Sequence, residues 1–347
     1  MSTPVVTLHQ NQSNPVDSKP SKIVEAYGLR KCPKLVEQCM AEDIVVRVNA
    51  LTVLCDEFRN SKSIYECCKA NVIDVLSKLI LDADYMCRFR SSQALAIAAE
   101  DANGFASILE KNVIPIILKG MQDKATEVRS NIYECMYQCS RLPNGIDAIV
   151  QAGGVGMFVE SVVSETDLLK VSLLKALYNT VKVEQGLADA LASDGVSVCV
   201  DLLGNGMEEV AAEACRTLGF LCYCEEAKDQ ALDCGSIPKL LDLLKSRSKP
   251  LRFSCSIALM AITSTDEGKR QMTDCGSAVA ALLIDPDVVV KLNALKVIAN
   301  VAVNPSVRKE LLEHETCQSS IVKMIDSGDT RLVKHAKIAL DAVRWKA

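Results

Sequence analysis

Ser236-Ile237-Pro238-Lys239-Leu240 has two counterparts earlier in the chain, Lys31-Cys32-Pro33-Lys34-Leu35 and Val113-Ile114-Pro115-Ile116-Ile117. The three stretches share a 41-residue phase that runs through most of the sequence. The residues in this phase are Cys32, Ile73, Ile114, Val155, Val196, Ile237 and Ala278, and a shortened step leads to Cys317. A period of this length indicates stacked helical units, each of which contacts only its neighbours.

Apolar residues within each repeat follow a helical spacing. Three residues after the shared position lie Leu35, Leu76, Ile117, Phe158, Cys199, Leu240 and Ala281. A mostly basic column begins a second long helix, fifteen residues after the shared position in six repeats: Arg47, Arg88, Arg129, Lys170, Ala211 and Arg252, followed by Lys291 and Lys334 at altered spacing. Seven residues further on, that helix carries Leu54, Leu95, Met136, Leu177, Leu218, Leu259 and Ile298. Offsets of three and seven lie on one helix face.

These patterns predict an all-α fold, a right-handed α-solenoid of the armadillo or HEAT type with about eight 41-residue repeats. Each repeat is expected to hold a short linking helix and two longer ones. Gly153, Asp194, Gly235 and Gly276 share one register at the repeat junctions, which suits a left-handed helix end. We predict that residues 22–347 form the solenoid. Residues 1–21, rich in proline and small polar residues, are predicted to be a disordered arm.

Composition argues against several classes of function. The net charge of −5 lacks the basic excess of a sequence-independent nucleic-acid binder, and no apolar run is long enough to span a membrane. Sixteen cysteines are scattered along the helical pattern, which predicts buried, reduced thiols. The short pairs Cys67-Cys68 and Cys222-Tyr223-Cys224 have no second pair at zinc spacing, so we predict no metal site and no cofactor.

No catalytic motif is complete, so the sequence predicts neither an enzyme nor a small-molecule substrate. Gly153-Gly154-Val155-Gly156 lacks the lysine and hydroxyl residue of a phosphate loop and falls at a repeat junction. Gly195-Val196-Ser197 lacks the closing glycine of a nucleophile elbow. The histidines His9, His314 and His335 are not spaced for a shared metal.

The outward face of the second long helix is the predicted partner-binding surface. Fold analogy with armadillo arrays places this face in a groove, where amide and charged side chains could hydrogen-bond an extended chain. Phe220 is the expected anchor, because aromatic side chains tend to dominate binding energy. The candidate contact residues are Asn49, Arg90, Gln93, Asn131, Glu134, Gln138, Lys175, Asn179, Arg216, Phe220, Ile257, Asn293, Lys296 and Asn300.

The basic column lies at helix starts, where positive charge is unfavourable with respect to the helix dipole. Because this unfavourable charge recurs from repeat to repeat, we expect that its partner also recurs. We expect internal pairing with nearby acids, for which the candidates are Glu42, Asp43, Asp84, Glu127, Asp167 and Asp287. Contact with an acidic partner protein is the alternative.

Over residues 25–347 the repeat resembles that of armadillo proteins, and among these it is similar to an armadillo-repeat family of axonemal radial spoke subunits from motile cilia and flagella. The residues that carry the resemblance are Glu25-Ala26-Tyr27-Gly28, Pro33-Lys34-Leu35, Asn49-Ala50-Leu51, Leu54-Cys55-Asp56, Ser63-Ile64-Tyr65, Ala258-Leu259-Met260, Glu267-Gly268-Lys269, Leu292-Asn293-Ala294 and Arg308-Lys309.

The resemblance implies a non-enzymatic building block of the radial spoke, with other spoke proteins as partners and the cytoskeleton of the axoneme as its location in the cytoplasm. A soluble cytosolic armadillo adaptor or transport receptor that binds an extended peptide is the alternative. Nuclear-import receptors carry a repeated Trp and Asn ladder, whereas Trp345 is the only tryptophan here. Recognition of a basic peptide by such a ladder is therefore not expected.

Overall fold

Every regular element in the described part of the chain is a helix. The computed structural model describes residues 28–345, and this range contains no β-strand. The arm predicted for residues 1–21 lies outside the described residues. The chain divides into two compact units, Met1–Val113 and Ile114–Ala347. A single solenoid domain over residues 22–347 stays a prediction.

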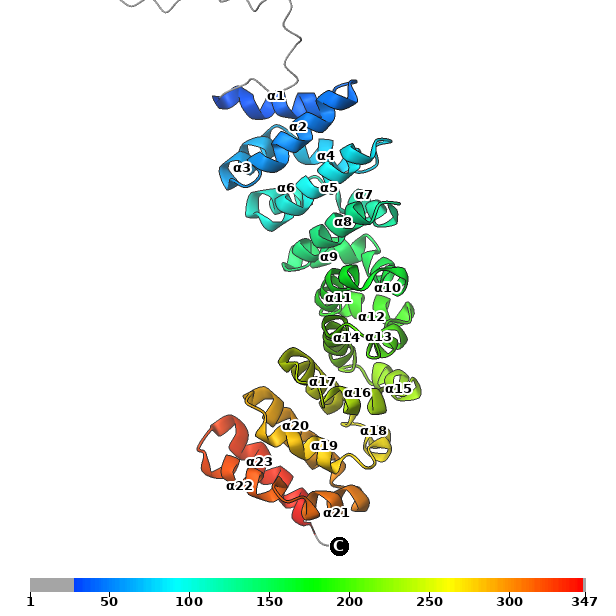
Figure 1. Ribbon diagram of the computed structural model, residues 1–347, viewed down its shortest axis with the longest axis vertical. Helices are drawn as coiled ribbons and strands as arrows, with labels where there is room; N and C mark the ends of the chain where they lie inside the picture. The colour runs from blue at the N-terminus through cyan, green and yellow to red at the C-terminus, as the bar shows by residue number, and fades with distance from the viewer. Residues whose placement is uncertain (1–27, 346–347) are drawn as a thin grey trace, which may run out of the picture. The chain divides into compact units, whose positions relative to one another are not determined.

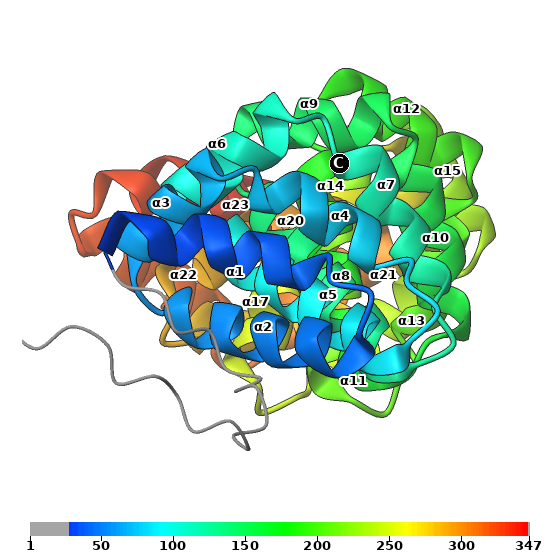
Figure 2. The same ribbon diagram turned by 90° about the horizontal axis from the view of Figure 1, so that it is seen from above.

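The first unit holds six α-helices among its described residues. The packing of α2 on α5, and of α3 on α6, joins its successive repeats (Figure 2). The elements are η1 (Gly28–Arg30), α1 (Lys31–Cys39), α2 (Ile44–Glu57), α3 (Ser61–Lys69), α4 (Val72–Leu79), α5 (Tyr85–Glu100) and α6 (Ala102–Glu110).

The second unit continues the same order of helices (Figure 1). Its elements are α7 (Ile114–Lys119), η2 (Gly120–Gln122), α8 (Thr126–Cys139), α9 (Pro143–Gln151), α10 (Gly154–Ser164), α11 (Asp167–Thr180), α12 (Glu184–Ala192), α13 (Gly195–Leu202), α14 (Glu208–Leu221), α15 (Glu225–Asp233), α16 (Ser236–Leu243), α17 (Lys249–Ile262), α18 (Asp266–Gln271), α19 (Gly276–Ala281), η3 (Leu282–Ile284), α20 (Val288–Val301), α21 (Pro305–Glu313), α22 (Cys317–Asp326) and α23 (Thr330–Arg344).

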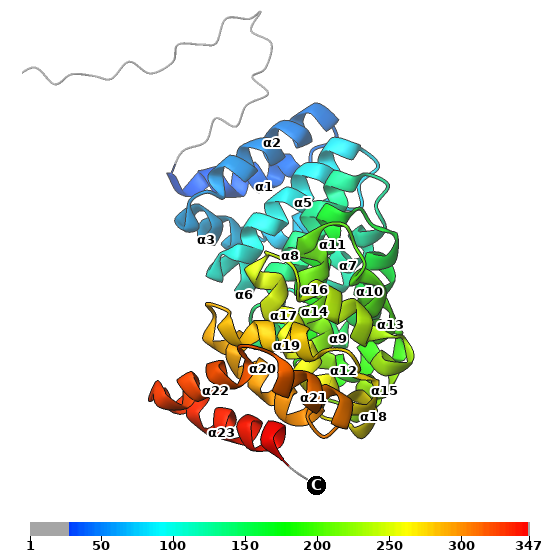
Figure 3. The ribbon, with the colours of Figure 1, turned by 60° about the horizontal axis from the view of Figure 1, so that its bottom comes forward.

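The repeat consists of a linking helix, a second helix and a longer third helix. Three helices in each repeat were predicted, but the linking helix was expected to be shorter than the second helix, whereas α12 and α15 have nine residues and α13 and α16 have eight. We call α2, α5, α8, α11, α14, α17, α20 and α23 the third helices. In the second unit each third helix packs on the next, from α8 through α23, and Figure 3 shows α20 beside α23. This nearest-neighbour packing makes an α-solenoid, because no helix of one repeat needs a distant repeat to cover its apolar face.

The predicted core column on the third helices, from Leu54 to Ile298, is buried in all seven repeats, whereas the column on the second helices is buried in six repeats and displaced in the seventh. Leu35, Leu76, Ile117, Phe158, Cys199 and Leu240 are all fully buried. The expected member Ala281 is exposed, and Val279 fills the core place instead. The prediction for Ala281, and with it the register that placed Ala278 at the shared position, is wrong by two residues.

The backbone conformation shows where in the seventh repeat this two-residue displacement arises. Left-handed residues recur 41 apart at the junctions before the second helices: Asn71, Asn112, Gly153, Asp194 and Gly235. The prediction is confirmed for the last three. It is wrong for Gly276, because the next left-handed residue is Asp274. The linking helix α18 is six residues long, whereas α12 and α15 have nine. The repeat is therefore shortened before Gly276.

A glycine column brings the linking helices close to the third helices. A Cβ atom added to Gly104, Gly186 or Gly268 would lie 2.1–2.3 Å from the carbonyl oxygen six residues earlier. Those carbonyls belong to Ala98, Thr180 and Ile262, near the ends of third helices. Ala227 takes this place in another repeat, so that repeat accommodates a methyl group there.

We expect Gly186→Ala to lower the free energy of unfolding by about 2 kcal/mol, since overpacking a tight contact typically costs about 1–3 kcal/mol. Urea denaturation followed by circular dichroism would measure the loss. Gly206→Ala is the matched control, because a Cβ there meets nothing within 4 Å. Equal stabilities of the two variants would contradict the proposed contact.

Two further properties bear on the sequence predictions. Thirteen of the sixteen cysteines are buried and all are free thiols, which confirms their expected role as core residues. Among residues 28–345, no single helix is both long and apolar enough to cross a membrane. Together, α9 and α10 reach that length and composition, but they bend by 82° at the break between them.

Candidate protein-binding surface

The third helices of the second unit are joined across their outward faces by side-chain amides. Asn179 Nδ2 donates to Ser140 Oγ of the preceding third helix at 3.1 Å. Asn300 Nδ2 donates to Thr263 Oγ1 in the same way at 3.3 Å. The asparagines of the predicted surface therefore tie adjacent repeats together as well as facing outward.

Asn293 is the clearest departure from the predicted contact set. Its side chain donates from Nδ2 to Ser256 Oγ at 3.0 Å, and only 4% of the residue is exposed. The prediction of Asn293 as a partner contact is wrong, because a buried amide that is already hydrogen-bonded cannot reach a partner in this structure.

Tyr178 of α11 is the centre of a group of cations and rings. The guanidinium carbon of Arg216 lies 3.8 Å from the centroid of the Tyr178 ring, and Lys182 Nζ lies 4.2 Å from it. Arg216 also pairs with Glu213 at 3.3 Å on its own helix, α14. Such cation–ring contacts hold long basic side chains at a fixed place on the surface.

Phe220 adds two more aromatic contacts. It meets the ring of Tyr178 edge to face, with centroids 6.0 Å apart, and the ring of Tyr223 at 5.5 Å. Tyr223 is 66% exposed and Phe220 is half-buried. We call Lys175, Tyr178, Lys182, Arg216, Phe220 and Tyr223 the aromatic–cation patch. It combines apolar rings with positive charge on α11, α14 and the turn after α14.

Gly219 lies 41 residues after Tyr178, at a close approach of α14 to α17. A Cβ there would approach Ile257 Cγ2 to 3.1 Å and the Ala258 nitrogen to 3.2 Å, so a large side chain would force the two helices apart. In this repeat the ring beside Tyr178 belongs instead to the next residue, Phe220.

Several predicted contact residues lie elsewhere. In the first unit, Arg90 donates to Gln93 at 2.9 Å, and Asn49 is half-buried on α2. In the second unit, the side-chain amide of Gln138 donates to Glu134 at 2.6 Å. The remaining predicted residues Asn131, Ile257 and Lys296 are half-buried on third helices, and their role in binding stays a prediction.

Sequence reasoning missed Tyr178, Lys182 and Tyr223. One signal was present, because Tyr137 and Tyr178 are 41 residues apart, and Lys175 Nζ lies 5.8 Å from the Tyr137 ring. The face predicted to bind a partner did not include this tyrosine column.

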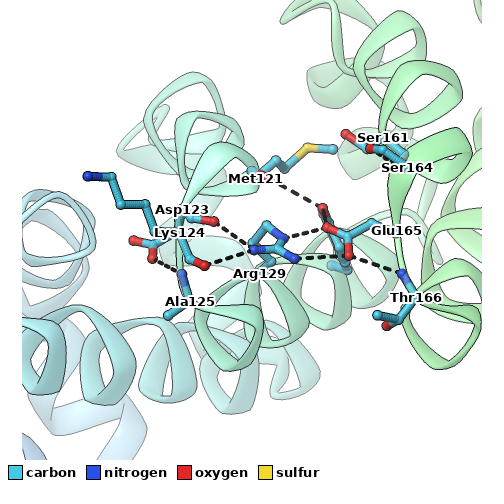
Figure 4. Close-up of polar contacts among 10 residues, drawn as sticks. Met121, Asp123, Lys124, Ala125, Arg129, Ser161, Ser164, Glu165 and Thr166 are labelled. Carbon is cyan, nitrogen blue, oxygen red and sulfur yellow. Dashed lines mark hydrogen bonds and ion pairs between the residues drawn. The ribbon is translucent and has the colours of Figure 1, made fainter.

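The basic column forms a structural staple between repeats. Arg47, Arg88, Arg129 and Arg252 each donate from Nη1 to the carbonyl oxygens five and six residues earlier. Arg47 also pairs with Asp82 of the next repeat at 3.6 Å, Arg129 with Glu165, and Arg252 with Asp285 at 2.6 Å. Figure 4 shows Arg129 between the 123–125 turn and Glu165. The expected internal pairing is confirmed for these arginines.

Three of the six acids proposed for this pairing instead cap helices. Asp43 and Asp84 cap α2 and α5 by accepting backbone N–H bonds, and Asp287 caps α20. Of the proposed acids, Asp167 does pair with a column residue, Lys170, at 3.2 Å. The carboxylates that pair with the arginines lie in the turn before the third helix of the following repeat. An aspartate in this position can also stabilise the turn.

A 290 Å³ pocket adjoins the Arg129 staple and is lined by polar groups, including Gln122, Glu160 and Ser161. Burial opposes ionisation of Glu165, but hydrogen bonds from Arg129 and Tyr133 outweigh it, so the pKa of the carboxyl is lowered. Burial, together with the bond to Glu165, raises the pKa of Tyr133. Both shifts come from internal pairing and give no sign of acid–base chemistry.

The motifs weighed for chemistry have structural roles. Gly153 is the left-handed cap of α10, and Val155 is buried in the core. Within residues 28–345, no group of three or more His, Cys, Asp or Glu side chains is placed to hold a metal ion.

No protein-family model matches the chain, but solved structures share its fold. An engineered protein of 24% sequence identity matches with a TM-score of 0.82 over 92% of this chain and 79% of its own. A computationally designed armadillo repeat protein for modular peptide recognition matches with a TM-score of 0.62 at 20% identity, covering 66% of this chain and 99% of its own. A designed armadillo repeat protein in complex with the peptide (KR)4 matches with a TM-score of 0.61 at 20% identity over 67% and 99%. The chain has the armadillo-type α-solenoid fold.

Proposed function

We propose that the chain is a non-enzymatic scaffold that binds neighbouring protein subunits through the outward faces of its third helices. The aromatic–cation patch carries this proposal. It brings three rings into contact and holds Lys182 and Arg216 over one of them, in a protein in which aromatic residues make up only 4% of the sequence. Solenoids of this fold typically act as binding scaffolds, and two structural neighbours are described as peptide-recognition or peptide-bound proteins.

The proposed assembly is the axonemal radial spoke of motile cilia and flagella. The support is the resemblance of the sequence to the radial spoke head 14 homologue. It rests on such stretches as Ser63-Ile64-Tyr65, Glu267-Gly268-Lys269 and Leu292-Asn293-Ala294. In this role the partners are other spoke proteins, the chain resides in the axonemal cytoskeleton, and it supports ciliary or flagellar motility.

A soluble adaptor or transport receptor is the second candidate, favoured by the designed neighbour bound to a short peptide. That peptide is basic, whereas the patch here presents Lys175, Lys182 and Arg216 with one carboxylate, Glu213. If the chain is an adaptor, its cargo should therefore differ from a lysine- and arginine-rich segment.

Fractionation of motile cilia separates the two candidates. A spoke subunit is expected to stay with detergent-stripped axonemes at moderate salt and to leave only in strongly dissociating salt. An adaptor is expected to leave with the detergent-soluble fraction. Immunoblotting of each fraction measures the distribution, with tubulin and a soluble cytosolic enzyme as controls. Recovery of most of the protein in the soluble fraction would reject the spoke assignment.

A further inference from the structure

The cations of the aromatic–cation patch outnumber its carboxylates. Arg216 pairs with Glu213 at 3.3 Å. Lys175 and Lys182 form no ion pair with any carboxylate among residues 28–345; Lys182 Nζ donates only to the neutral amide oxygen of Asn179, at 2.8 Å. Two positive charges therefore lack an anionic partner, although the chain as a whole carries a net charge of −5.

Arg216 and Lys182 are held close together by the Tyr178 ring. Because Arg216 and Lys182 lie 3.8 Å and 4.2 Å from the Tyr178 centroid, they are at most about 8 Å from each other. The Debye length at physiological salt is also about 8 Å, so salt screens the repulsion between these two positive charges only in part. A bound carboxylate would relieve this repulsion, and Arg216 has more N–H donors than its single bond to Glu213 uses.

The rings beside the cations supply apolar contact. Phe220 is clamped between Tyr178 and Tyr223, and Tyr223 leaves 66% of its surface open. Residues i and i+2 of an extended chain point to the same side about 7 Å apart. A segment with a carboxylate two residues from an aliphatic or aromatic side chain could thus meet a cation and a ring together.

We propose that the aromatic–cation patch binds an extended acidic peptide segment of a partner protein, one that alternates carboxylates with apolar side chains. The inference rests on the proposed scaffold function and specifies the class of its partner. It differs from recognition of a basic segment, which the unpaired lysines would repel.

Fluorescence anisotropy with the full chain tests the proposal. The probe is a labelled peptide of four Glu-Pro-Leu units, and the comparison peptide has four Lys-Pro-Leu units. At 50 mM salt the acidic peptide is expected to bind at least tenfold more tightly than the basic one. Raising the salt to 300 mM should weaken that binding severalfold, because the attraction is electrostatic.

Two variants locate the site. The double change Lys175→Glu with Lys182→Glu is expected to remove the tenfold preference. The control pair Lys323→Glu and Lys337→Glu makes the same change of charge at exposed residues of α22 and α23 and should leave the preference intact. Phe220→Ala should weaken acidic-peptide binding about fivefold without changing the charge. Circular dichroism confirms that each variant is folded.

The outcomes distinguish this inference from the scaffold proposal. Equal or tighter binding of the basic peptide, or an acidic preference that survives the Lys175 and Lys182 changes, overturns the acidic-peptide site. So does failure of both peptides to bind at 100 µM while the protein remains with stripped axonemes, and in that case the scaffold proposal stands. If the protein leaves the axonemes but binds the acidic peptide tightly, the spoke assignment fails and the acidic-peptide site stands.

Discussion

Raising the pH from 7.5 to 9.5 in the presence of a reductant is expected to destabilise this protein sharply. Burial raises the pKa of Cys39, Cys55, Cys199, Cys222 and Cys275 to about 12, and that of Cys317 to about 11. The thiol of an unfolded chain has a pKa of about 8.5. These six groups thus stay protonated in the folded protein at a pH where the unfolded chain loses the protons.

The sign follows from proton linkage. A pKa that is raised on folding contributes stability that is fully present below the unfolded value of about 8.5 and is lost as the pH rises towards the folded value. Each such thiol removes about 1.4 kcal/mol by pH 9.5, so six remove about 8 kcal/mol. A domain of ordinary stability, about 5–15 kcal/mol, would lose most of its margin over this range.

Urea midpoints measured by circular dichroism at intervals from pH 7.5 to 9.5 test this expectation. Cys199→Ala removes one titrating thiol and should make the total decline between pH 7.5 and 9.5 smaller by about 1.4 kcal/mol. Cys234→Ala is the control, because that side chain is exposed. A midpoint that stays constant across the range would show that the buried thiols do not govern stability.

The sequence showed altered spacing in the seventh repeat, at Lys291, but placed the shortening after the shared position Ala278. Val279 rather than Ala281 fills the core of the seventh repeat, because the shortening lies in α18, before the second helix begins. Gly276 and Asp274 both tolerate a left-handed backbone. Backbone preference therefore could not predict which of the two residues adopts the left-handed conformation. That depends on which apolar side chain of the second helix reaches the core.

Partner binding by the outward face stays a prediction, but the structure shows side-chain contacts on that face that the sequence did not reveal. Phe220 was chosen for its position on the predicted face, whereas Tyr178 was not. Tyr178 matters because Arg216 and Phe220 of the following repeat contact its ring. The spacing of residues along one helix does not show such contacts between helices. The prediction of Asn293 as a partner contact was wrong for a related reason. Its side-chain amide donates to Ser256, which lies 37 residues earlier, just short of one repeat.

Glu165→Ala is expected to lower the free energy of unfolding by about 3 kcal/mol. The Glu165 side chain is 6% exposed and accepts hydrogen bonds from Arg129 and from the Tyr133 hydroxyl, at 2.7 Å for the latter. Removing it leaves the guanidinium, 19% exposed, without its carboxylate and the buried hydroxyl without its acceptor. Breaking a buried ion pair by deleting one partner costs about 3–5 kcal/mol. We take the lower end because the arginine keeps its bonds to two backbone carbonyls.

Two further variants separate loss of the charge from loss of the side chain. Glu165→Gln can still accept from Tyr133 but no longer neutralises Arg129, so an intermediate loss of about 1–2 kcal/mol is expected. Glu160→Ala, an exposed position on the same helix α10, should change stability by less than about 0.5 kcal/mol. Chemical denaturation measures all three.

A double-mutant cycle decides whether the staple acts as a unit. Arg129→Met removes the charge while keeping much of the apolar stem, and it leaves Glu165 with only Tyr133 and a backbone N–H as donors. If the two side chains stabilise the repeat junction through each other, the double variant Arg129→Met with Glu165→Ala should lose at least about 1 kcal/mol less than the sum of the single losses. Additive losses would mean that each residue acts separately, and the repeated arginine would then contribute only through the carbonyls of its own turn.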